Sequence, residues 1–221
     1  MNIHIEVRII LLATCLLFVS NKSIAQDSIP TASITIDTLT EVSEVTEMVD
    51  PTTLLPKHYL PTQRILWGEK GLMRNFSLFK LSEQSRDLEL DIRDKMFTAH
   101  RYIGFATLAG MVAQGIVGER LYNGHSNLKD LHEGLAGAVN IGYFTTAGMA
   151  FLAPPRLKDR PFGLNTLTIH QCLSIVHLSS MIATNVLSGM TEHNPNLKRL
   201  HRAAAYTAFG SFFAAMVVIN F

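Results

Sequence analysis

The second half of the chain is a series of four apolar segments separated by short polar stretches. The segments cover approximately residues 96–117, 131–153, 166–190 and 200–221. Each contains 22 to 25 residues, close to the roughly 20 residues that a helix needs to cross the hydrocarbon layer of a membrane. The pattern therefore predicts four transmembrane helices.

The polar stretches contain typical turn-forming residues, and Pro154-Pro155 ends the second segment. Short connections make successive helices antiparallel neighbours. Small residues recur inside the segments, as close packing of helices in lipid requires. The turn residues are Asn123-Gly124, Pro161-Phe162-Gly163 and Asn194-Pro195, and the small residues include Gly104, Gly110, Gly134, Gly137, Gly142 and Gly148. We expect an all-α membrane protein in which residues 96–221 form an antiparallel four-helix transmembrane bundle.

The first 25 residues have the organisation of a secretory signal peptide. Arg8 precedes an apolar run from Ile9 to Val19, and Ser23-Ile24-Ala25 supplies small residues for cleavage. Eleven apolar residues are short for a membrane span, which favours a cleaved signal over an anchor helix. The signal predicts insertion into a bacterial inner membrane, with residues 26–95 on the periplasmic side.

The region between the signal and the bundle is expected to have two parts. Residues 26–63 form a tether, flexible because residues 26–56 are rich in Thr, Ser and Pro and carry six acidic residues but no Lys or Arg. Residues 64–95 form an amphipathic juxtamembrane segment. Apolar residues recur at helical spacing over residues 64–81, which is consistent either with a helix on the membrane surface or with a loop that covers the bundle.

The distribution of Lys and Arg opposes the orientation that the signal peptide predicts. Six of these residues flank the spans on the N-terminal side and four flank them on the other, and positive charge favours the cytoplasm. The six are Arg86, Arg93, Lys95, Arg156, Lys158 and Arg160, and the four are Arg120, Lys129, Lys198 and Arg199. The difference is small, and we base the orientation on the signal peptide.

The charge balance and the cysteines exclude several kinds of protein. The 19 Lys and Arg nearly equal the 18 Asp and Glu, so no bulk positive charge is present to hold a nucleic acid. Hydrophobic residues make up 48% of the chain, too many for a fully disordered protein. After cleavage of the signal, Cys172 is the single remaining cysteine, which rules out a disulfide framework within one chain.

Histidines carry the candidate chemistry. Ionisable residues inside membrane spans are costly and usually functional. His100 and His170 lie near the starts of the first and third segments, 70 residues apart, and His132 and His201 lie near the starts of the second and fourth, 69 residues apart. Because alternate helices run in the same direction, each pair shares one side of the membrane. Two imidazoles that face each other across a bundle are suited to hold one haem iron.

The arrangement resembles the cytochrome b561 superfamily. The likeness rests on His100-Arg101-Tyr102-Ile103-Gly104, Leu131-His132-Glu133-Gly134, Ile169-His170 and Leu197-Lys198-Arg199-Leu200-His201-Arg202. It implies two haem b groups with these four histidines as axial ligands, and electron transfer across the membrane. No ascorbate-site motif is present, so the electron donor and acceptor, whether quinone or redox protein, do not transfer. The implied role is that of an electron-transfer cytochrome or redox subunit rather than a stand-alone catalyst.

Several residues near the histidines have two interpretations. His177 lies seven residues after His170 on the same helical face, and it is an alternative ligand or a packing neighbour. Arg101 and Arg202 each follow a proposed ligand and are suited to bind haem propionates or to reach lipid headgroups. Gly104 and Gly134 provide room either for a macrocycle or for helix packing.

Two other functions fit parts of the pattern. The chain could anchor a partner redox protein through structural histidines, or, with less support, it could be a metal-ion transporter. Transporters usually add intramembrane carboxylates and broken helices, and the four segments contain almost no Asp or Glu. The expected partners are membrane lipid and a second copy of the chain in a possible homodimer.

Overall fold

The structure is a computed structural model that describes residues 54–157, 163, 165–191 and 193–220. All of them belong to the second of two units of the chain, residues 49–221. The predicted signal peptide, residues 26–53 of the predicted tether, and Lys158 and Arg160 lie outside the described residues. The described part consists of helices and turns, with no β-strand.

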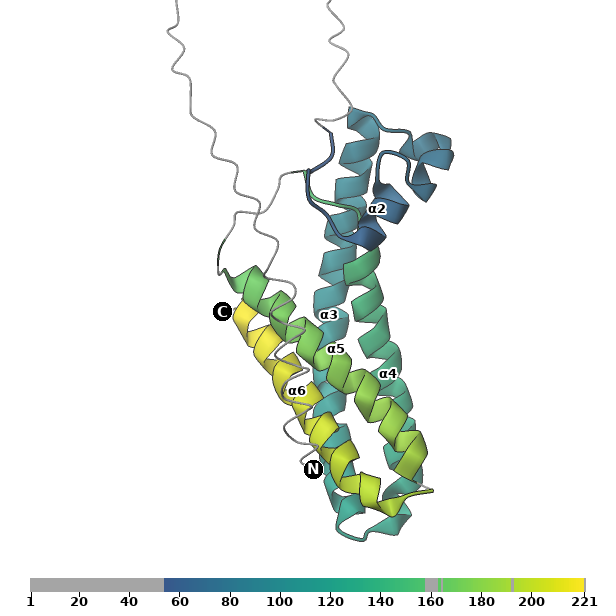
Figure 1. Ribbon diagram of the computed structural model, residues 1–221, viewed down its shortest axis with the longest axis vertical. Coiled ribbons are helices and arrows are strands. Elements are labelled where there is room, and N and C mark those ends of the chain that lie inside the picture. Colours follow the sequence, from purple (N-terminus) through teal and green to yellow (C-terminus); the bar gives the residue numbers. More distant parts are fainter. Residues whose placement is uncertain (1–53, 158–162, 164, 192, 221) are drawn as a thin grey trace, which may run out of the picture. The chain divides into compact units, whose positions relative to one another are not determined.

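Four long helices make up most of the described chain (Figure 1). They are α3 (Glu83–Tyr122), α4 (Lys129–Leu152), α5 (Thr166–Thr191) and α6 (Lys198–Asn220). Helix α3 packs along α4, helix α5 packs along α6, and a smaller contact joins α3 to α6. The fold is therefore two helical hairpins placed against each other.

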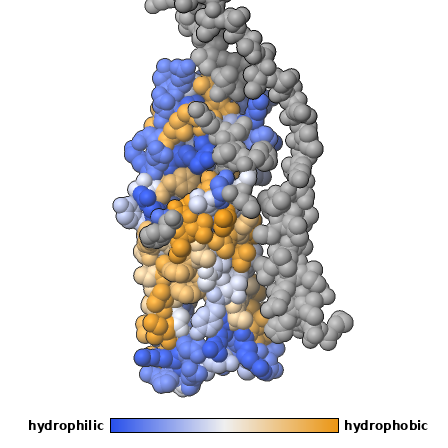
Figure 2. Space-filling model, turned by 90° about the vertical axis from the view of Figure 1, so that its left-hand side faces the viewer, coloured by the Kyte–Doolittle hydropathy of each residue, from blue (hydrophilic) through white to orange (hydrophobic). Residues whose placement is uncertain are grey.

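Three of the helical segments are long and apolar enough to cross a membrane. They are Ser126–Leu152, Thr166–Thr191 and Pro195–Asn220. On the face that Figure 2 shows, hydrophobic residues form a belt between hydrophilic ends. Helix α3, which contains the first predicted span, is not among the three. Its apolar stretch is interrupted by His100 and Arg101 and again by Gln114, and each of these polar side chains lowers its mean hydropathy.

The turns between the helices form at the predicted residues. Helix α3 ends at Tyr122, and Gly124 then adopts φ of 101°, which favours glycine. The amides of Asn123 and Gly124 donate to carbonyls of the last turn of α3, which satisfies groups that a helix end leaves open. Before α6, the Asn194 side chain accepts from the Asn196 amide at 3.2 Å and starts a short 3₁₀ turn, η5 (Pro195–Leu197).

Helix α3 begins thirteen residues before the first predicted span. The Ser82 hydroxyl accepts from the Ser85 amide at 3.2 Å, and the Ser85 hydroxyl in turn accepts from the Ser82 amide at 3.1 Å. Such reciprocal capping starts a helix. The expected division between residues 64–95 and residues 96–221 therefore falls inside one continuous helix.

The residues before α3 form a small folded element, which we call the collar (residues 54–82). It contains α2 (Pro61–Trp67) and two 3₁₀ turns, η2 (Leu72–Asn75) and η3 (Ser77–Phe79). The collar includes residues 54–63, which the sequence assigned to the flexible tether. A single surface helix over residues 64–81 does not form, because Gly68 and Gly71 interrupt it. The alternative expectation, a segment that covers the bundle, describes the collar better.

The collar binds the carboxyl end of α4. A helix leaves its last carbonyl groups without partners, and here five successive carbonyls from Phe151 to Pro155 each accept from a side chain. The donors are Thr62 Oγ1 (2.7 Å), Trp67 Nε1 (2.8 Å), Gln63 Nε2 (2.9 Å), Arg93 Nη1 and Arg86 Nη2 (3.0 Å). These bonds hold the collar and α3 against the end of α4.

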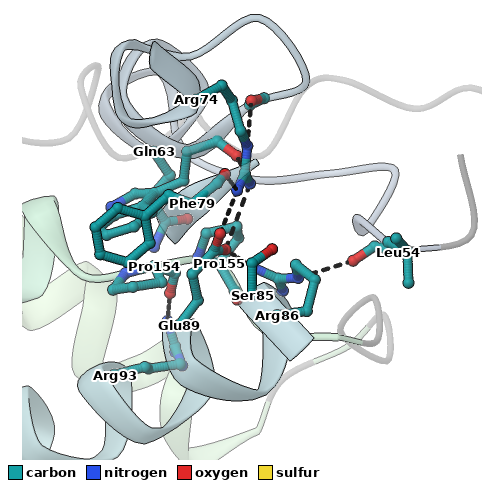
Figure 3. A network of polar contacts seen from close by, with 12 residues as sticks. Leu54, Gln63, Arg74, Phe79, Ser85, Arg86, Glu89, Arg93, Pro154 and Pro155 are labelled. Carbon is teal, nitrogen blue, oxygen red and sulfur yellow. Dashed lines mark hydrogen bonds and ion pairs between the residues drawn. The ribbon is translucent and has the colours of Figure 1, made fainter. Parts of the chain in front are cut away.

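A buried ion cluster holds the collar against the first turns of α3 (Figure 3). Glu89 is fully buried and forms ion pairs with both Arg74 of the collar and Arg86 of α3. Arg86 also donates to the carbonyl of Leu54 at 2.9 Å, and Arg74 donates to that of Phe79 at 2.7 Å. One carboxylate therefore compensates two buried guanidinium groups whose remaining donors face carbonyl oxygens.

Replacing Glu89 by Gln should loosen the collar, because removing one partner of a buried ion pair typically costs about 3–5 kcal/mol. Trp67 is the single tryptophan of the chain, so its emission during denaturant titration in detergent reports this unfolding step directly. The control is Asp91→Asn, which breaks the exposed Asp91–Lys95 pair on the same helix and should change stability by less than about 1 kcal/mol. Equal shifts for the two variants would contradict the assigned role of Glu89.

Candidate functional site

The histidines singled out in the sequence lie at two levels of the helices. His100 of α3 and His170 of α5 interact electrostatically with each other, and we call their surroundings the upper site. His132 of α4 and His201 of α6 face each other with ring centroids 6.5 Å apart and planes inclined by 72°, and we call their surroundings the lower site. The structure brings together the two pairs that the spacing suggested.

Each upper histidine is oriented by a main-chain carbonyl of the neighbouring helix in its own hairpin. His100 Nδ1 donates to the carbonyl of Thr146 at 2.9 Å, and His170 Nδ1 donates to that of Ala215 at 2.9 Å. A carbonyl oxygen only accepts, so Nδ1 carries the proton and a neutral ring leaves Nε2 with its lone pair. This is the orientation that metal-binding histidines usually have.

The lower site repeats this arrangement at one of its two histidines. His201 Nδ1 donates to the carbonyl of Thr184 at 3.0 Å. His132 differs, because its Nε2 lies 3.3 Å from the side-chain amide nitrogen of Gln114. Its ring also lies against α3, where a Cβ added to Gly118 would be 2.9 Å from Cε1 and 3.2 Å from Nδ1 of His132.

One spacing relates the two levels on all four helices. Each helix carries a histidine at one level and, fourteen residues away, the contact residue of its hairpin partner's histidine at the other. The pairs of positions are 100 and 114, 132 and 146, 170 and 184, and 201 and 215. Fourteen residues are nearly four turns and about 21 Å, so the two levels lie on similar helix faces and fit within an apolar layer about 30 Å thick.

A packed core separates the two levels. Tyr143, Met181 and Phe212 lie in one cluster to which all four long helices contribute. His177 borders this cluster, where its Nδ1 shares a hydrogen bond with the Tyr143 hydroxyl and its ring contacts Phe212 at a centroid distance of 5.2 Å. His177 therefore occupies the middle of the bundle as a hydrogen-bonded neighbour, which agrees with one of its two expected roles.

The two arginines that follow proposed ligands differ in their surroundings. Arg101 is exposed, and its guanidinium lies 5.9 Å from the ring centroid of Tyr102. Arg202 donates to Glu119 of α3 at 2.8 Å, and Glu119 also accepts from the Tyr206 hydroxyl at 2.9 Å. Arg202 thus joins α6 to α3 beside the lower site, a contact that the sequence did not suggest.

The two glycines also differ. Gly104 is buried next to the upper site, and a Cβ added there would meet no atom within 4 Å. Open space therefore borders this glycine. Gly134 is exposed, so it does not line the lower site as expected.

The remaining polar residues within the spans mostly pair between helices, as the sequence suggested for them. Asn140 of α4 and Asn185 of α5 exchange two hydrogen bonds of 2.7 and 2.9 Å. Sequence reasoning gave Gln114 only such a pairing role and missed Gly118 and Glu119 as neighbours of the lower site. The fourteen-residue spacing measured from each histidine is the signal that could have identified Gln114.

Both sites offer features that suit a metal held between two imidazoles. Metal–imidazole bonds are about 2 Å long, so two rings on opposite sides of one ion have centroids roughly 6 Å apart, near the separation of His132 and His201. Among the described residues, no three or more His, Cys, Asp or Glu side chains are grouped to hold a metal ion, so the histidine pairs are the units to consider. Buried polar atoms without a partner among the described residues also gather at the lower site, namely Gln114 Oε1, His132 Nδ1 and Arg202 Nε.

No family model, curated protein or solved structure matches the chain.

A methyl group at position 118 should disturb the lower site. Gly118→Ala places a Cβ in contact with the His132 ring, and such overpacking costs about 1–3 kcal/mol. Gly115→Ala is the control on the same helix, where an added Cβ meets nothing within 4 Å and alanine should be neutral or stabilise the helix by up to about 1 kcal/mol. Unfolding by detergent titration measures both, and opposite signs are expected. Similar values would show that His132 does not rest on this glycine.

Proposed function

We propose that this protein transfers electrons across a membrane through two b-type haems, each held by one pair of histidines. In this proposal α3 is the fourth transmembrane helix, and α3–α6 form a four-helix transmembrane bundle of the kind found in the cytochrome b561 superfamily. The observation that carries the proposal is the set of three Nδ1–carbonyl hydrogen bonds, which orient His100, His170 and His201 alike.

Each residue of the sites has a definite part in this function. His100 and His170 would hold the iron of the upper haem, and His132 and His201 that of the lower haem. A haem iron supplies one-electron redox chemistry when bound. The carbonyls of Thr146, Ala215 and Thr184 keep the imidazoles in the tautomer that binds metal.

The residues around the histidines support a flat, partly anionic group. The open space beside Gly104 gives room at the upper site, and Arg202 Nε is a donor in need of an acceptor at the lower site. Arg101 is exposed near His100 and is available to a propionate or to lipid. The cluster around Tyr143, Met181 and Phe212 would exclude water from the space between the two haems.

The orientation follows from the signal peptide. Residues 26–95, including the collar, would lie in the periplasm of a bacterium, and the turn at Asn123-Gly124 in the cytoplasm. The upper haem would then exchange electrons with a periplasmic partner and the lower haem with a cytoplasmic or lipid-soluble one, a redox protein or a quinone. An anchor for a partner redox protein remains the second hypothesis, and a haem assay separates the two.

The purified protein should contain two haems per chain that are lost separately. His100→Ala or His170→Ala should remove one haem, and His132→Ala or His201→Ala the other, because a haem b has no covalent attachment and depends on its axial ligands. Extracted haem per chain and the reduced-minus-oxidised spectrum measure the result. His177→Ala is the control and should keep both haems. Wild-type protein without haem would refute the proposal, and loss of a haem in His177→Ala with two retained in His170→Ala would reassign the ligand in α5.

A reporter enzyme active only in the periplasm should be silent when fused at Gly124 and active when fused within residues 26–53. The expectation follows from the signal peptide and an even number of spans. Protease access in spheroplasts gives an independent measurement. The reverse result would mean that the small excess of Lys and Arg on the collar side determines the orientation.

A further inference from the structure

His132 is the exception among the four paired histidines. The other three donate from Nδ1 to a main-chain carbonyl and so keep Nε2 available. At the corresponding position beside His132 a side chain makes the contact instead, and Nε2 is the atom engaged, 3.3 Å from the Gln114 amide nitrogen. In this arrangement the amide donates to Nε2, the nitrogen that would bind iron if His132 behaved like its three counterparts.

The contact leaves one buried polar atom unpaired on each residue. His132 Nδ1 and Gln114 Oε1 are both buried without a hydrogen-bond partner among the described residues. With Nε2 accepting, the proton of a neutral His132 ring is on Nδ1, so a buried donor and a buried acceptor lie on neighbouring residues and are not joined. Unpaired buried groups of this kind are costly.

Gly118 explains why Nδ1 has no main-chain partner. The Nδ1 side of the ring rests against α3 at Gly118, where even a Cβ would collide with it. Helix α3 continues through this point to Tyr122, so its main-chain carbonyls are used within the helix. A flexible side chain from the same helix is the acceptor nearest at hand, and Gln114 is one turn away.

We propose that Gln114 is a positioning residue of the lower site: its amide oxygen accepts from His132 Nδ1 when the site is loaded, which frees Nε2 for iron. The inference rests on the proposed two-haem function. It satisfies both unpaired atoms with one bond and gives His132 the orientation of the other three histidines. The lower site is then the only one of the two whose ligand orientation depends on a side chain that can be exchanged by mutation.

Two substitutions test the role of Gln114, with the upper haem in the same molecule as the internal control. Gln114→Leu removes the acceptor, so the affinity of the lower site for haem should fall about 10–100-fold, as for other partners of metal-bound histidines. Gln114→Glu keeps an acceptor and strengthens it, so the lower haem should be retained with a lower midpoint potential, because a more basic imidazole stabilises the oxidised iron. The upper haem should keep its potential in both variants.

The measurements are haem titration of the purified full chain, redox titration followed in the visible spectrum, and electron paramagnetic resonance of the oxidised iron. His100→Ala protein, which should keep only the lower haem, assigns the signals. Two haems in wild type with an unchanged lower-haem affinity, potential and resonance in both Gln114 variants would overturn the inference and leave the proposed function intact. Absence of haem from wild type would instead remove the proposed function and this inference with it. If Gln114→Leu fails to fold, as loss of both haems would indicate, the potential of Gln114→Glu decides.

Discussion

The distance covered by fourteen helical residues is the constraint on which the arrangement of the two sites depends. Fourteen residues fall short of four full turns by about 40°, so a helix presents nearly the same face at both levels. A histidine at one level and the contact residue of its hairpin partner's histidine at the other can therefore both point inward. All four helices use this spacing, and antiparallel packing alternates which end carries the histidine.

A similar requirement for hydrogen-bond partners shapes the collar. The end of α4 exposes carbonyl groups at the point where a candidate span finishes, and an apolar layer offers them no water. Side chains of the collar and of α3 accept this task at five successive positions. The long polar extension of α3 above its apolar stretch is the support that brings Arg86 and Arg93 to those carbonyls, with Glu89 compensating the buried positive charge of Arg74 and Arg86.

The sequence predicted the features that follow from periodicity and spacing. The ends of α4, α5 and α6 lie within a few residues of the predicted segments, because prolines and turn residues mark them clearly. The histidine pairs were also predictable, because depth in an antiparallel bundle follows from position along each helix. The start of α3 was not, since the capping by Ser82 and Ser85 comes before a stretch whose apolar pattern is weak.

Contacts between side chains distant in the chain could not be read from the pattern. Glu89 joins residues 15 positions before it and 3 before it into one cluster, and only the fold of the collar brings Arg74 there. In the same way, Glu119 is 83 residues from Arg202, and nothing local distinguishes it from an ordinary charge at a helix end. Such pairs depend on the rotation of each helix about its axis, which the sequence leaves open by more than the width of a side chain.

The two hairpins correspond position by position, yet their polar contacts differ, and this difference matters for the proposed function. Two haems in identical surroundings would have equal potentials, and nothing within the bundle would favour one direction of transfer. The upper histidines both meet main-chain carbonyls, whose acceptor strength is the same. At the lower site one histidine meets a carbonyl and the other an amide side chain, with Glu119 and Arg202 adding charge beside them. Because hydrogen bonds to an axial imidazole tune the metal that it binds, the asymmetry at His132 is a physical source of unequal potentials within an otherwise symmetric arrangement.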